Sequence, residues 1–464
     1  MLKLTNTLSK EKENFSSLEE GLVKIYHCGP TVYWNQHIGN MRGMLMGDII
    51  RRSLMFLGYK VLYVSNYTDF GHLTSDADSG EDKMEKAAKR EQLDPKTIAD
   101  KYIAQFEKDI AALNILQPTV RARATDYVQE MILLVEELLV KDYAYATPKA
   151  IYFEVAKFAK YNELNKQKLD ENMSGAGFGD VTDPAKKHPA DFALWFFKTG
   201  AHKNALQYWP SPFISSEVEN GNGFPGWHIE CSAMIRKELG KTIDIHIGGI
   251  EHVAVHHTNE IAQSEAANDA PFVKYWLHNE HLNMNGKKIS KSDGNFVLLD
   301  DLIAKGYHPM HLRYFFLQAH YRSKQNFTYE ALDAAKTAYE KLANIVRQWQ
   351  GSNIEDANAS VDFVAKFKEA LADDFNMPKA LAVVWELTKS KELNTTKLST
   401  IKLFDEVLGL NLIKAEVKAT KLEPAIIELL KSRERARAEK NWKEADKIRA
   451  KLLEKYDYQV TDKN

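Results

Sequence analysis

The sequence predicts an α/β protein in which a Rossmann-type parallel sheet is interrupted by an inserted α+β domain and followed by an all-helical C-terminal part. Apolar residues at 22–26, a helical apolar repeat at 44–54 and an apolar run at 61–64 give a strand, a helix and a strand in order. This order builds parallel nucleotide-binding sheets. The strand pattern returns at 243–246, ahead of a helical stretch, which supplies the second half of the sheet. Residues from about 312 onward are predicted to be helical.

The stretch between the two halves of the predicted sheet changes in character. A helix is expected near residues 127–140, and it is followed by alternating apolar residues at 151–155 and a glycine-rich loop. These patterns indicate an inserted domain. The predicted boundaries are a Rossmann-type domain split between 1–118 and 200–311, an inserted connective domain at 119–199, a helical domain at 312–414 and a short basic C-terminal segment at 415–464.

Composition and charge are typical of a large globular enzyme without a membrane segment. The 464 residues exceed the length of one ordinary core, and the chain is 44% hydrophobic and 27% charged. Its apolar runs fall short of the roughly 18 residues needed to span a bilayer, and its N-terminus lacks the pattern of a secretory signal. We therefore expect a cytoplasmic protein.

The C-terminal region is locally basic although the formal net charge of the chain is only -2. Residues 431–451 carry nine basic side chains against four acidic ones. Either a solvated helix face or a face that binds RNA phosphates would have this composition. The apolar side of the segment is expected to contain Ala436, Trp442, Ala445, Ile448 and Leu452.

Cys28 and Cys231 are the only two cysteines, which is too few for a disulfide framework. In a reducing compartment both are available as thiolates. His256 and Glu260 lie four residues apart on one helical face, and Cys, His and Glu are all accepted zinc ligands. These residues allow a four-ligand metal site, which their spacing alone does not favour over two small buried cysteines and a packed histidine. The alternatives are two small buried side chains, one structural disulfide, or a cysteine and histidine that form a nucleophile pair.

Two short segments suit the phosphates of a nucleotide. Residues 37–40, His-Ile-Gly-Asn, lie between the first strand and the first helix, where free N–H groups and the helix dipole favour a bound phosphate. Gly39 would let a nucleotide approach the backbone closely. Residues 288–292, Lys-Ile-Ser-Lys-Ser, offer ammonium groups that can stabilise a leaving pyrophosphate. Taken singly, the two segments are also consistent with a plain turn and a solvated basic loop.

These segments together resemble the cysteinyl-tRNA synthetases, a family of class I aminoacyl-tRNA synthetases, over nearly the whole chain. Residues 28–39 resemble the HIGH region of the family, and residues 288–292 resemble its KMSKS loop with Ile289 in place of methionine. The other matching segments are two metal-bearing stretches at 226–234 and 256–264, a helical tRNA-binding stretch at 373–381 and the last conserved segment at 433–449.

The resemblance implies a ligase that activates L-cysteine with ATP to cysteinyl-adenylate and transfers it to the 3′-terminal adenosine of tRNA(Cys). It further implies one Zn²⁺ per chain with the substrate's sulfur as an extra ligand, Mg²⁺ with the ATP, and a monomer. Zinc binds a thiolate much better than a hydroxyl, so cysteine would be chosen over serine without a separate editing site. Residues 312–414 would bind tRNA, and residues 415–464 would form the anticodon region.

Carried onto this sequence, the resemblance assigns roles to individual residues. Cys28, Cys231, His256 and Glu260 would hold the metal. Catalytic roles would fall to His37, Asn40, Lys288 and Lys291. Contacts to substrate or ATP would come from Gly29, Thr31, Gly39, Thr68, Trp227, Gly248, Gly249, Glu251, Ile289, Ser290 and Ser292.

The sequence departs from the family pattern at three places. Asn40 stands where the second histidine of HIGH is expected, so it can donate a hydrogen bond but cannot serve a proton-dependent role. Glu251 stands where the family usually has an aspartate against the ATP ribose. The glycine- and tryptophan-bearing tail common in the family is not seen after Tyr458, which leaves open which anticodon bases are read.

Two other functions remain as alternatives. One is a ligase of similar sequence that joins cysteine to an amino-sugar, against which the helical residues from about 330 to 464 speak. The other is a catalytically silent RNA-binding or regulatory relative, which Asn40 keeps open and the full set of metal ligands and lysines disfavours.

Overall fold

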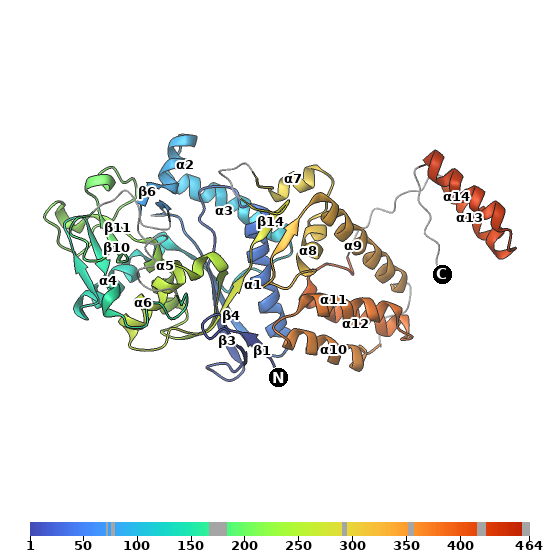
Figure 1. The fold of residues 1–464 in the computed structure, drawn as a ribbon, viewed down its shortest axis with the longest axis horizontal. Coiled ribbons are helices and arrows are strands. Elements are labelled where there is room, and N and C mark those ends of the chain that lie inside the picture. The colour runs from blue at the N-terminus through green and yellow to red at the C-terminus, as the bar shows by residue number, and fades with distance from the viewer. Residues whose placement is uncertain are drawn as a thin grey trace. The chain divides into compact units, whose positions relative to one another are not determined.

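The computed structural model describes residues 1–70, 73–75, 79–166, 183–289, 295–350, 357–414 and 424–456. Contacts divide the chain into two compact units, Met1–Ile413 and Lys414–Asn464 (Figure 1). Among the described residues, no helix is both long enough and apolar enough to cross a membrane.

The first unit is built on a five-stranded sheet in the order β13-β12-β3-β4-β7, in which every neighbouring pair is parallel. The predicted Rossmann-type sheet is therefore confirmed. Because the chain leaves β3 toward β4 and later returns to its other side as β12, the carboxyl ends of β3 and β12 form the crevice where such sheets bind ligands. The strands are β3 (Leu22–His27), β4 (Lys60–Tyr67), β7 (Val120–Arg123), β12 (Ile243–Gly249) and β13 (Val273–Asn279).

Helix α1 (Ile38–Phe56) joins β3 to β4 and begins in the first phosphate segment. Its start is fixed by a capping box, in which His37 Nδ1 accepts from the N–H of Asn40 (3.2 Å) and Asn40 Oδ1 accepts from the N–H of His37 (3.2 Å). Farther along, a Cβ on Gly47 would lie 2.4 Å from His27 Nδ1 and 2.2 Å from the Tyr63 hydroxyl. A glycine there lets the helix pack directly against the sheet.

The inserted part forms a four-stranded antiparallel sheet in the order β11-β10-β9-β8, backed by α4 (Val128–Val140). The alternating apolar residues expected at 151–155 lie at β9, where Phe153 stacks on Phe192 of β10 with ring centroids 5.1 Å apart. The boundaries 119–199 stay a prediction. Within this range, β7 pairs with β4 and so belongs to the parallel sheet and not to the inserted one. The strands of the inserted sheet are β8 (Ala144–Ala146), β9 (Ala150–Phe153), β10 (Phe192–Phe197) and β11 (Gly223–Pro225).

Helices dominate the first unit after the sheet, as the sequence predicts, with one exception. The short strand β16 (Gln325–Phe327) pairs in parallel with β14 (Leu282–Met284), so the expectation of unbroken helix after residue 312 is wrong there. The polar residues around it gave no strand pattern. The helices are α7 (Leu299–Ala304), α8 (Pro309–Leu317), α9 (Tyr329–Trp349), α10 (Val361–Ala372), α11 (Met377–Lys389) and α12 (Asn394–Leu408).

Smaller elements complete the first unit. Two of its helices, α5 and α6, pack against each other beside the sheet and carry most of the predicted metal ligands. The remaining elements are β1 (Lys3–Thr5), β2 (Lys12–Asn14), β5 (Leu73–Ser75), β6 (Ser79–Asp82), α2 (Lys83–Glu91), α3 (Pro95–Ala112), α5 (Trp227–Glu238), α6 (His256–Asn268) and β15 (Lys287–Lys288).

A buried charge network joins α1 to three other helices. Asp48 Oδ2 accepts from Arg52 Nε (2.8 Å) and from Arg313 Nη2 of α8 (2.8 Å). The two guanidinium groups also donate to carbonyls at the ends of α3 and α12, namely those of Leu113, Asn114, Glu406 and Leu408. The helix that carries the first phosphate segment is therefore fixed at its far end by paired charges.

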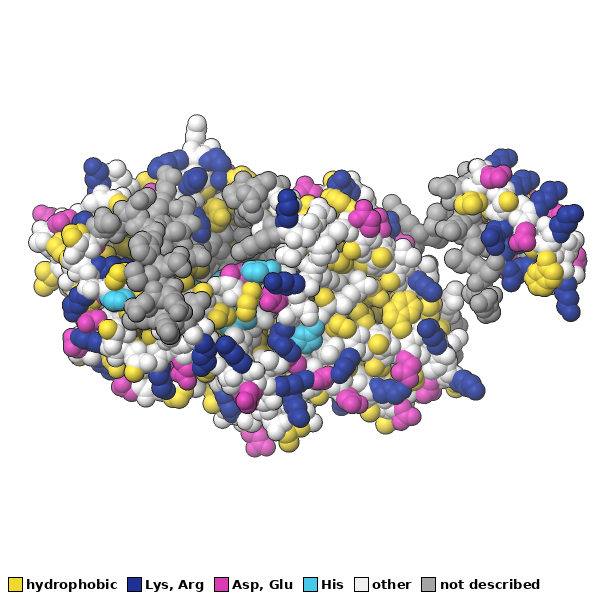
Figure 2. All heavy atoms as spheres, in the orientation of Figure 1, with side chains coloured by type: hydrophobic (Ala, Val, Ile, Leu, Met, Phe, Trp, Pro, Cys, Tyr) yellow, Lys and Arg dark blue, Asp and Glu magenta, His cyan; other side chains and the backbone are white. Residues whose placement is uncertain are grey.

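The second unit is a helical hairpin of α13 (Pro424–Ala438) and α14 (Trp442–Tyr456). Ile448 and Leu452 are buried in its small core, as the sequence predicts. Trp442 is not, because 57% of it is exposed, and the Arg437 guanidinium lies 5.8 Å from the centroid of its ring. Figure 2 shows several basic side chains, interspersed with acidic and apolar ones, on the face of the hairpin that is in view. The prediction of Trp442 as part of the apolar face is wrong because it begins α14 at the turn, outside the interface of the two helices.

Candidate active site

A cavity of about 630 Å³ opens at the carboxyl ends of β3 and β12. Its wall joins the first phosphate segment to most of the predicted metal cluster. Glu260 and Gly248 are not part of the wall, although both lie on elements that form it. The predicted site residues that line the cavity are Cys28, Gly29, Thr31, His37, Gly39, Asn40, Thr68, Trp227, Cys231, Gly249, Glu251 and His256.

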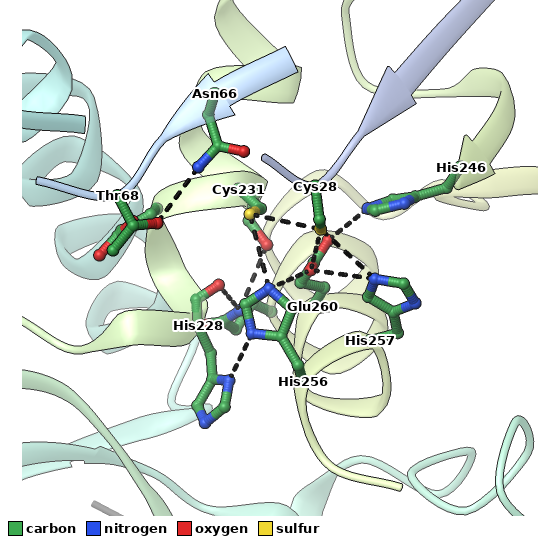
Figure 3. A network of polar contacts seen from close by, with 12 residues as sticks. Cys28, Asn66, Thr68, His228, Cys231, His246, His256, His257 and Glu260 are labelled. Atoms are coloured by element: carbon green, nitrogen blue, oxygen red, sulfur yellow. Dashed lines mark hydrogen bonds and ion pairs between the residues drawn. The ribbon is translucent and has the colours of Figure 1, made fainter. Parts of the chain in front are cut away.

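The four predicted metal ligands come together in the structure (Figure 3). One ligand atom from each of Cys28, Cys231, His256 and Glu260 lies within 4.8 Å of the others, and all four residues are buried. The two Sγ atoms are 3.9 Å apart, and Cys231 Sγ is 3.5 Å from His256 Nε2. Ligands bound about 2.0–2.3 Å from a tetrahedral zinc ion stand roughly 3.3–3.8 Å from one another. In size and in residue type, the cluster fits zinc.

The proton affinities of these groups also fit a metal site. Burial opposes ionisation of Cys231, but a hydrogen bond from Cys28 lowers the pKa of Cys231 to about 6. Burial opposes protonation of His256, but Glu260 raises the pKa of His256 to about 10. Burial and the neighbouring Cys231 raise the pKa of Cys28. These shifts favour the thiolate of Cys231 and the protonated forms of His256 and Cys28, and a bound cation would replace the protons of His256 and Cys28.

The alternative interpretations of the cysteines are less consistent with this geometry. Both thiols are free, and a separation of 3.9 Å between the Sγ atoms is far beyond the roughly 2.05 Å of a disulfide bond. Two inert buried thiols would not require a carboxylate with 0% exposure beside them, yet Glu260 is such a carboxylate. Each thiol does lie beside a histidine, so the nucleophile pair is disfavoured by the complete ligand set and not by distance.

Further histidines support the cluster, and the sequence analysis missed them. His246 Nε2 on β12 lies 2.7 Å from Glu260 Oε2, and His228 Nδ1 on α5 lies 2.9 Å from His256 Nδ1. Such partners orient a ligating side chain and fix its tautomer. Its position in the sequence could have indicated His246, because it lies in the strand predicted at 243–246. In the structure that strand pairs with β3, which ends just before Cys28.

A second group of four potential ligands overlaps the first. It consists of Cys28, His246, His257 and Glu260. His257 Nε2 is 3.4 Å from Cys28 Sγ, while its Nδ1 is 2.7 Å from His278 Nε2. Neither His246 nor His257 lines the cavity, whereas three members of the first group do. A metal in the first group would be open to a substrate.

The pocket beside the cluster is shaped by Trp227 and Thr68. The Trp227 ring stacks on His256 with centroids 4.3 Å apart and planes at 23°. Thr68 Oγ1 donates to Glu230 Oε2 (2.8 Å), a carboxylate with no exposed surface. A Cβ on Gly29 would lie 1.6 Å from the carbonyl oxygen of Asn66, so only glycine fits where these two backbone segments meet. Trp227 and Thr68 therefore line the same cavity as the two thiols.

The other part of the cavity contains the first phosphate segment. His37 and Asn40 line it, and a Cβ on Gly39 would lie 3.4 Å from Ile289 Cδ1, so the two phosphate segments are adjacent. Half of the Glu251 side chain is exposed, and its Oε2 lies 3.6 Å from His281 Nδ1. The backbone of Lys288 lies in β15, but its side chain and Ser290, Lys291 and Ser292 are outside the described residues.

Comparison with known proteins identifies the family. A family model described as "tRNA synthetases class I (C) catalytic domain" matches residues 14–337. "Cysteine--tRNA ligase 1" of Burkholderia lata is 43% identical over 452 residues, covering 97% of this chain and 93% of its own. The chain belongs to the cysteine–tRNA ligase family. A "Cysteine--tRNA ligase" of Treponema denticola is 40% identical, with 97% of this chain and 96% of its own covered.

Two further family models match the C-terminal half of this member of the cysteine–tRNA ligase family. One, described as "DALR domain", matches residues 366–412, and the other, "Cysteinyl-tRNA ligase anticodon binding domain", matches residues 419–463. The second match agrees with the anticodon region predicted at 415–464. The amino-sugar ligase is disfavoured on the same ground, since such proteins were expected to lack this region.

Solved structures of class I synthetases share the fold of this family member. Methionyl-tRNA synthetase of Mycobacterium tuberculosis in complex with methionyl-adenylate aligns over 84% of this chain and 90% of its own, with a TM-score of 0.55 and 14% identity. LeuRS of Agrobacterium radiobacter, solved as a ternary complex, aligns over 86% and 84%, with a TM-score of 0.61 and 12% identity. These likenesses concern the fold alone.

Proposed function

We propose that this chain activates L-cysteine with ATP, giving cysteinyl-adenylate and pyrophosphate, and then transfers the cysteinyl group to the 3′-terminal adenosine of tRNA(Cys). The observation that carries the proposal is a single cavity. It is lined both by residues of the metal-ligand cluster and by the start of α1, which is suited to bind phosphate. Family membership agrees with it. A cytoplasmic location, a monomeric state and Mg²⁺ bound with the ATP belong to the same proposal.

Recognition of cysteine is assigned to the cluster of Cys28, Cys231, His256 and Glu260. When bound there, one zinc ion would accept the substrate thiolate and so distinguish it from the hydroxyl of serine. The chain's own groups orient the rest of the substrate. Trp227 and Thr68 line the cavity beside the cluster, where the Trp227 ring stacks on His256 and the Thr68 hydroxyl donates to Glu230 and accepts from Asn66.

Recognition of ATP is assigned to the start of α1. Because His37 Nδ1 accepts a hydrogen bond from Asn40, the proton of the neutral ring is on Nε2, which can donate to a phosphate oxygen. Asn40 Oδ1 is engaged with the N–H of His37, and its amide Nδ2 is the group that can donate to a nucleotide. Asparagine therefore replaces the second histidine of HIGH as a capping and donor group.

The chemistry follows from this placement. The carboxylate of cysteine attacks the α-phosphorus of ATP, the bond to the β-phosphate oxygen breaks, and pyrophosphate leaves. His37, with Lys288 and Lys291 as proposed from the sequence, would stabilise the charge on the phosphates. A hydroxyl of the terminal ribose of tRNA then attacks the carbonyl carbon of the adenylate, and AMP leaves.

Cysteine-dependent exchange of pyrophosphate into ATP tests the activation step. The purified protein is expected to exchange pyrophosphate with cysteine and to discriminate against serine by about 10⁴-fold or more in kcat/KM, because serine leaves a ligand position poorly filled. A reaction without amino acid is the control. Exchange with serine at a comparable rate would contradict metal-based selection, and no exchange with either in the presence of zinc would contradict the function.

Trp442 provides a test of the second unit. Its exposed ring on a basic hairpin is suited to stack on an unpaired base, and such stacking contributes about 1–3 kcal/mol per base. We expect Trp442→Ala to raise the KM for tRNA(Cys) in charging and to leave pyrophosphate exchange unchanged. Leu453→Ala is the matched control, because Leu453 is an exposed apolar residue of the same helix. Equal effects of both substitutions would exclude stacking.

A further inference from the structure

Arg42 lies on α1 two residues beyond Asn40, and its side chain is fully buried. Its guanidinium donates to backbone carbonyls of two separate segments. Nη1 donates to Glu280 O, while Nη2 donates to His320 O (3.3 Å) and Ser323 O (2.8 Å). Burial lowers the pKa of Arg42 to about 10, which leaves the group charged at neutral pH. The first phosphate segment is thus held to residues that lie more than 200 positions away in the sequence.

The two segments held by Arg42 are bonded to each other and lead to Lys288. The N–H of Glu280 donates to Tyr321 O (2.9 Å), and the N–H of Gln325 donates to His281 O (3.3 Å). From there the chain enters β14, which pairs with β16 on one side and with β15 on the other. Since β15 carries Lys288, Arg42 connects the start of α1 to the strands from which the second phosphate segment begins.

Asp374, in the loop between α10 and α11, holds residues 320–323 from the helical side. Its buried carboxylate accepts from the Tyr321 hydroxyl (2.7 Å), from Arg322 Nε (2.8 Å) and from the Thr5 hydroxyl (2.7 Å). Its carbonyl lies 2.9 Å from His320 Nε2. Asp374 has a φ of 62°, in the left-handed region, a conformation that persists where surrounding contacts determine it. Asp374 therefore binds His320, Tyr321 and Arg322 of the segment whose His320 and Ser323 carbonyls accept from Arg42.

We propose that Arg42 is a positioning residue for adenylate formation, which through residues 320–323 fixes the start of α1 relative to β14 and β15, the strand that carries Lys288. Asp374 anchors those residues to the loop between α10 and α11. Arg42 does not line the cavity, so its effect is exerted through the backbone carbonyls that it binds. The assignment rests on the proposed function. It concerns the geometry of the phosphates, so it leaves the binding of zinc and of the cysteine side chain unaffected.

Arg42→Lys tests this assignment. Lysine keeps the charge but lacks the rigid fork that reaches three carbonyls. We expect kcat for cysteine-dependent pyrophosphate exchange to fall roughly 10- to 100-fold, as for other small displacements of reacting groups. The zinc content and the KM for cysteine are expected to stay at wild-type values. The thermal midpoint is measured on the same sample.

Arg52→Lys is the matched control. Arg52 is a second buried arginine of α1 that donates to distant carbonyls, those of Asn114 and Glu406. These carbonyls lie at the ends of α3 and α12, and not in the segments that lead to β14 and β15. We expect Arg52→Lys to lower the thermal midpoint at least as much as Arg42→Lys while kcat for exchange stays near wild type. An equal loss of kcat in the two variants would overturn the assignment, as would wild-type kcat in Arg42→Lys.

Asp374→Asn is a second test, independent of how well Arg42→Lys folds. The amide keeps the shape of the side chain but loses the ion pair with Arg322. We expect kcat for exchange to fall in the same direction with the zinc content unchanged, and wild-type kcat would overturn the assignment. Wild-type protein without cysteine-dependent exchange would overturn both this assignment and the proposed function, whereas normal exchange in all variants would overturn this assignment alone.

Discussion

Cys231→Ala is expected to remove the bound metal and, with it, the activation of cysteine. Cys231 is buried between Cys28 and His256, and its loss would leave three of four ligands and a void at the position of the thiolate. Because even the partners of metal ligands change affinity by about 10- to 100-fold, loss of a ligand should lower zinc affinity by more than about 100-fold. Zinc content by elemental analysis and pyrophosphate exchange are measured together.

The control for this variant is Ser232→Ala, which removes a hydroxyl from the next buried residue of α5. It should retain zinc near one per chain and wild-type exchange. Unchanged zinc content in Cys231→Ala would place Cys231 outside the site. Zinc loss with unchanged exchange would separate the metal from cysteine activation.

Asp48→Ala is expected to destabilise the first unit by about 3–5 kcal/mol, since it leaves two buried guanidinium groups without their shared counter-ion. Asp48 is the only residue that links Arg52 and Arg313 through a carboxylate in the described part of the chain, and it also accepts from the N–H of Leu116 (2.9 Å). The free energy of unfolding is measured in urea by tryptophan fluorescence.

Asp362→Ala serves as the control for Asp48→Ala, because Asp362 is an exposed aspartate of α10. Its free energy of unfolding should remain within about 0.5 kcal/mol of wild type. If Asp48→Ala were also within that range, the buried network would not fix α1 to the helices around it.

The fold was predictable where a pattern is local. The strand, helix and strand around α1 show as an apolar repeat of roughly helical spacing between two apolar stretches, and β12 coincides with the strand pattern at 243–246. The antiparallel partners of the inserted sheet and the strand β16 were less accessible, because strand pairing depends on residues distant in sequence. The three residues of β16, Gln-Asn-Phe, have no strand pattern of their own and form a strand because they pair with β14.

The candidate site was predictable to the extent that it depends on residue type. Cys28, Cys231, His256 and Glu260 could be grouped because the chain has only two cysteines, because His256 and Glu260 are four residues apart, and because the segments around them resemble those of the family. The structure brings the four together. His246 and His228 could not be predicted in the same way. Their role depends on the tertiary contacts that bring His246 to Glu260 and His228 to His256. The same limit applies to Arg42, whose partners are carbonyl oxygens that carry no sequence signal.

The central claim is that the thiolate of the substrate binds the metal held by Cys28, Cys231, His256 and Glu260. The most direct measurement replaces zinc with Co²⁺ and follows the ultraviolet thiolate-to-cobalt charge-transfer band during titration with cysteine. The band should increase and saturate with cysteine and remain unchanged with serine. A protein that exchanges pyrophosphate with cysteine but shows no change in this band would contradict the claim.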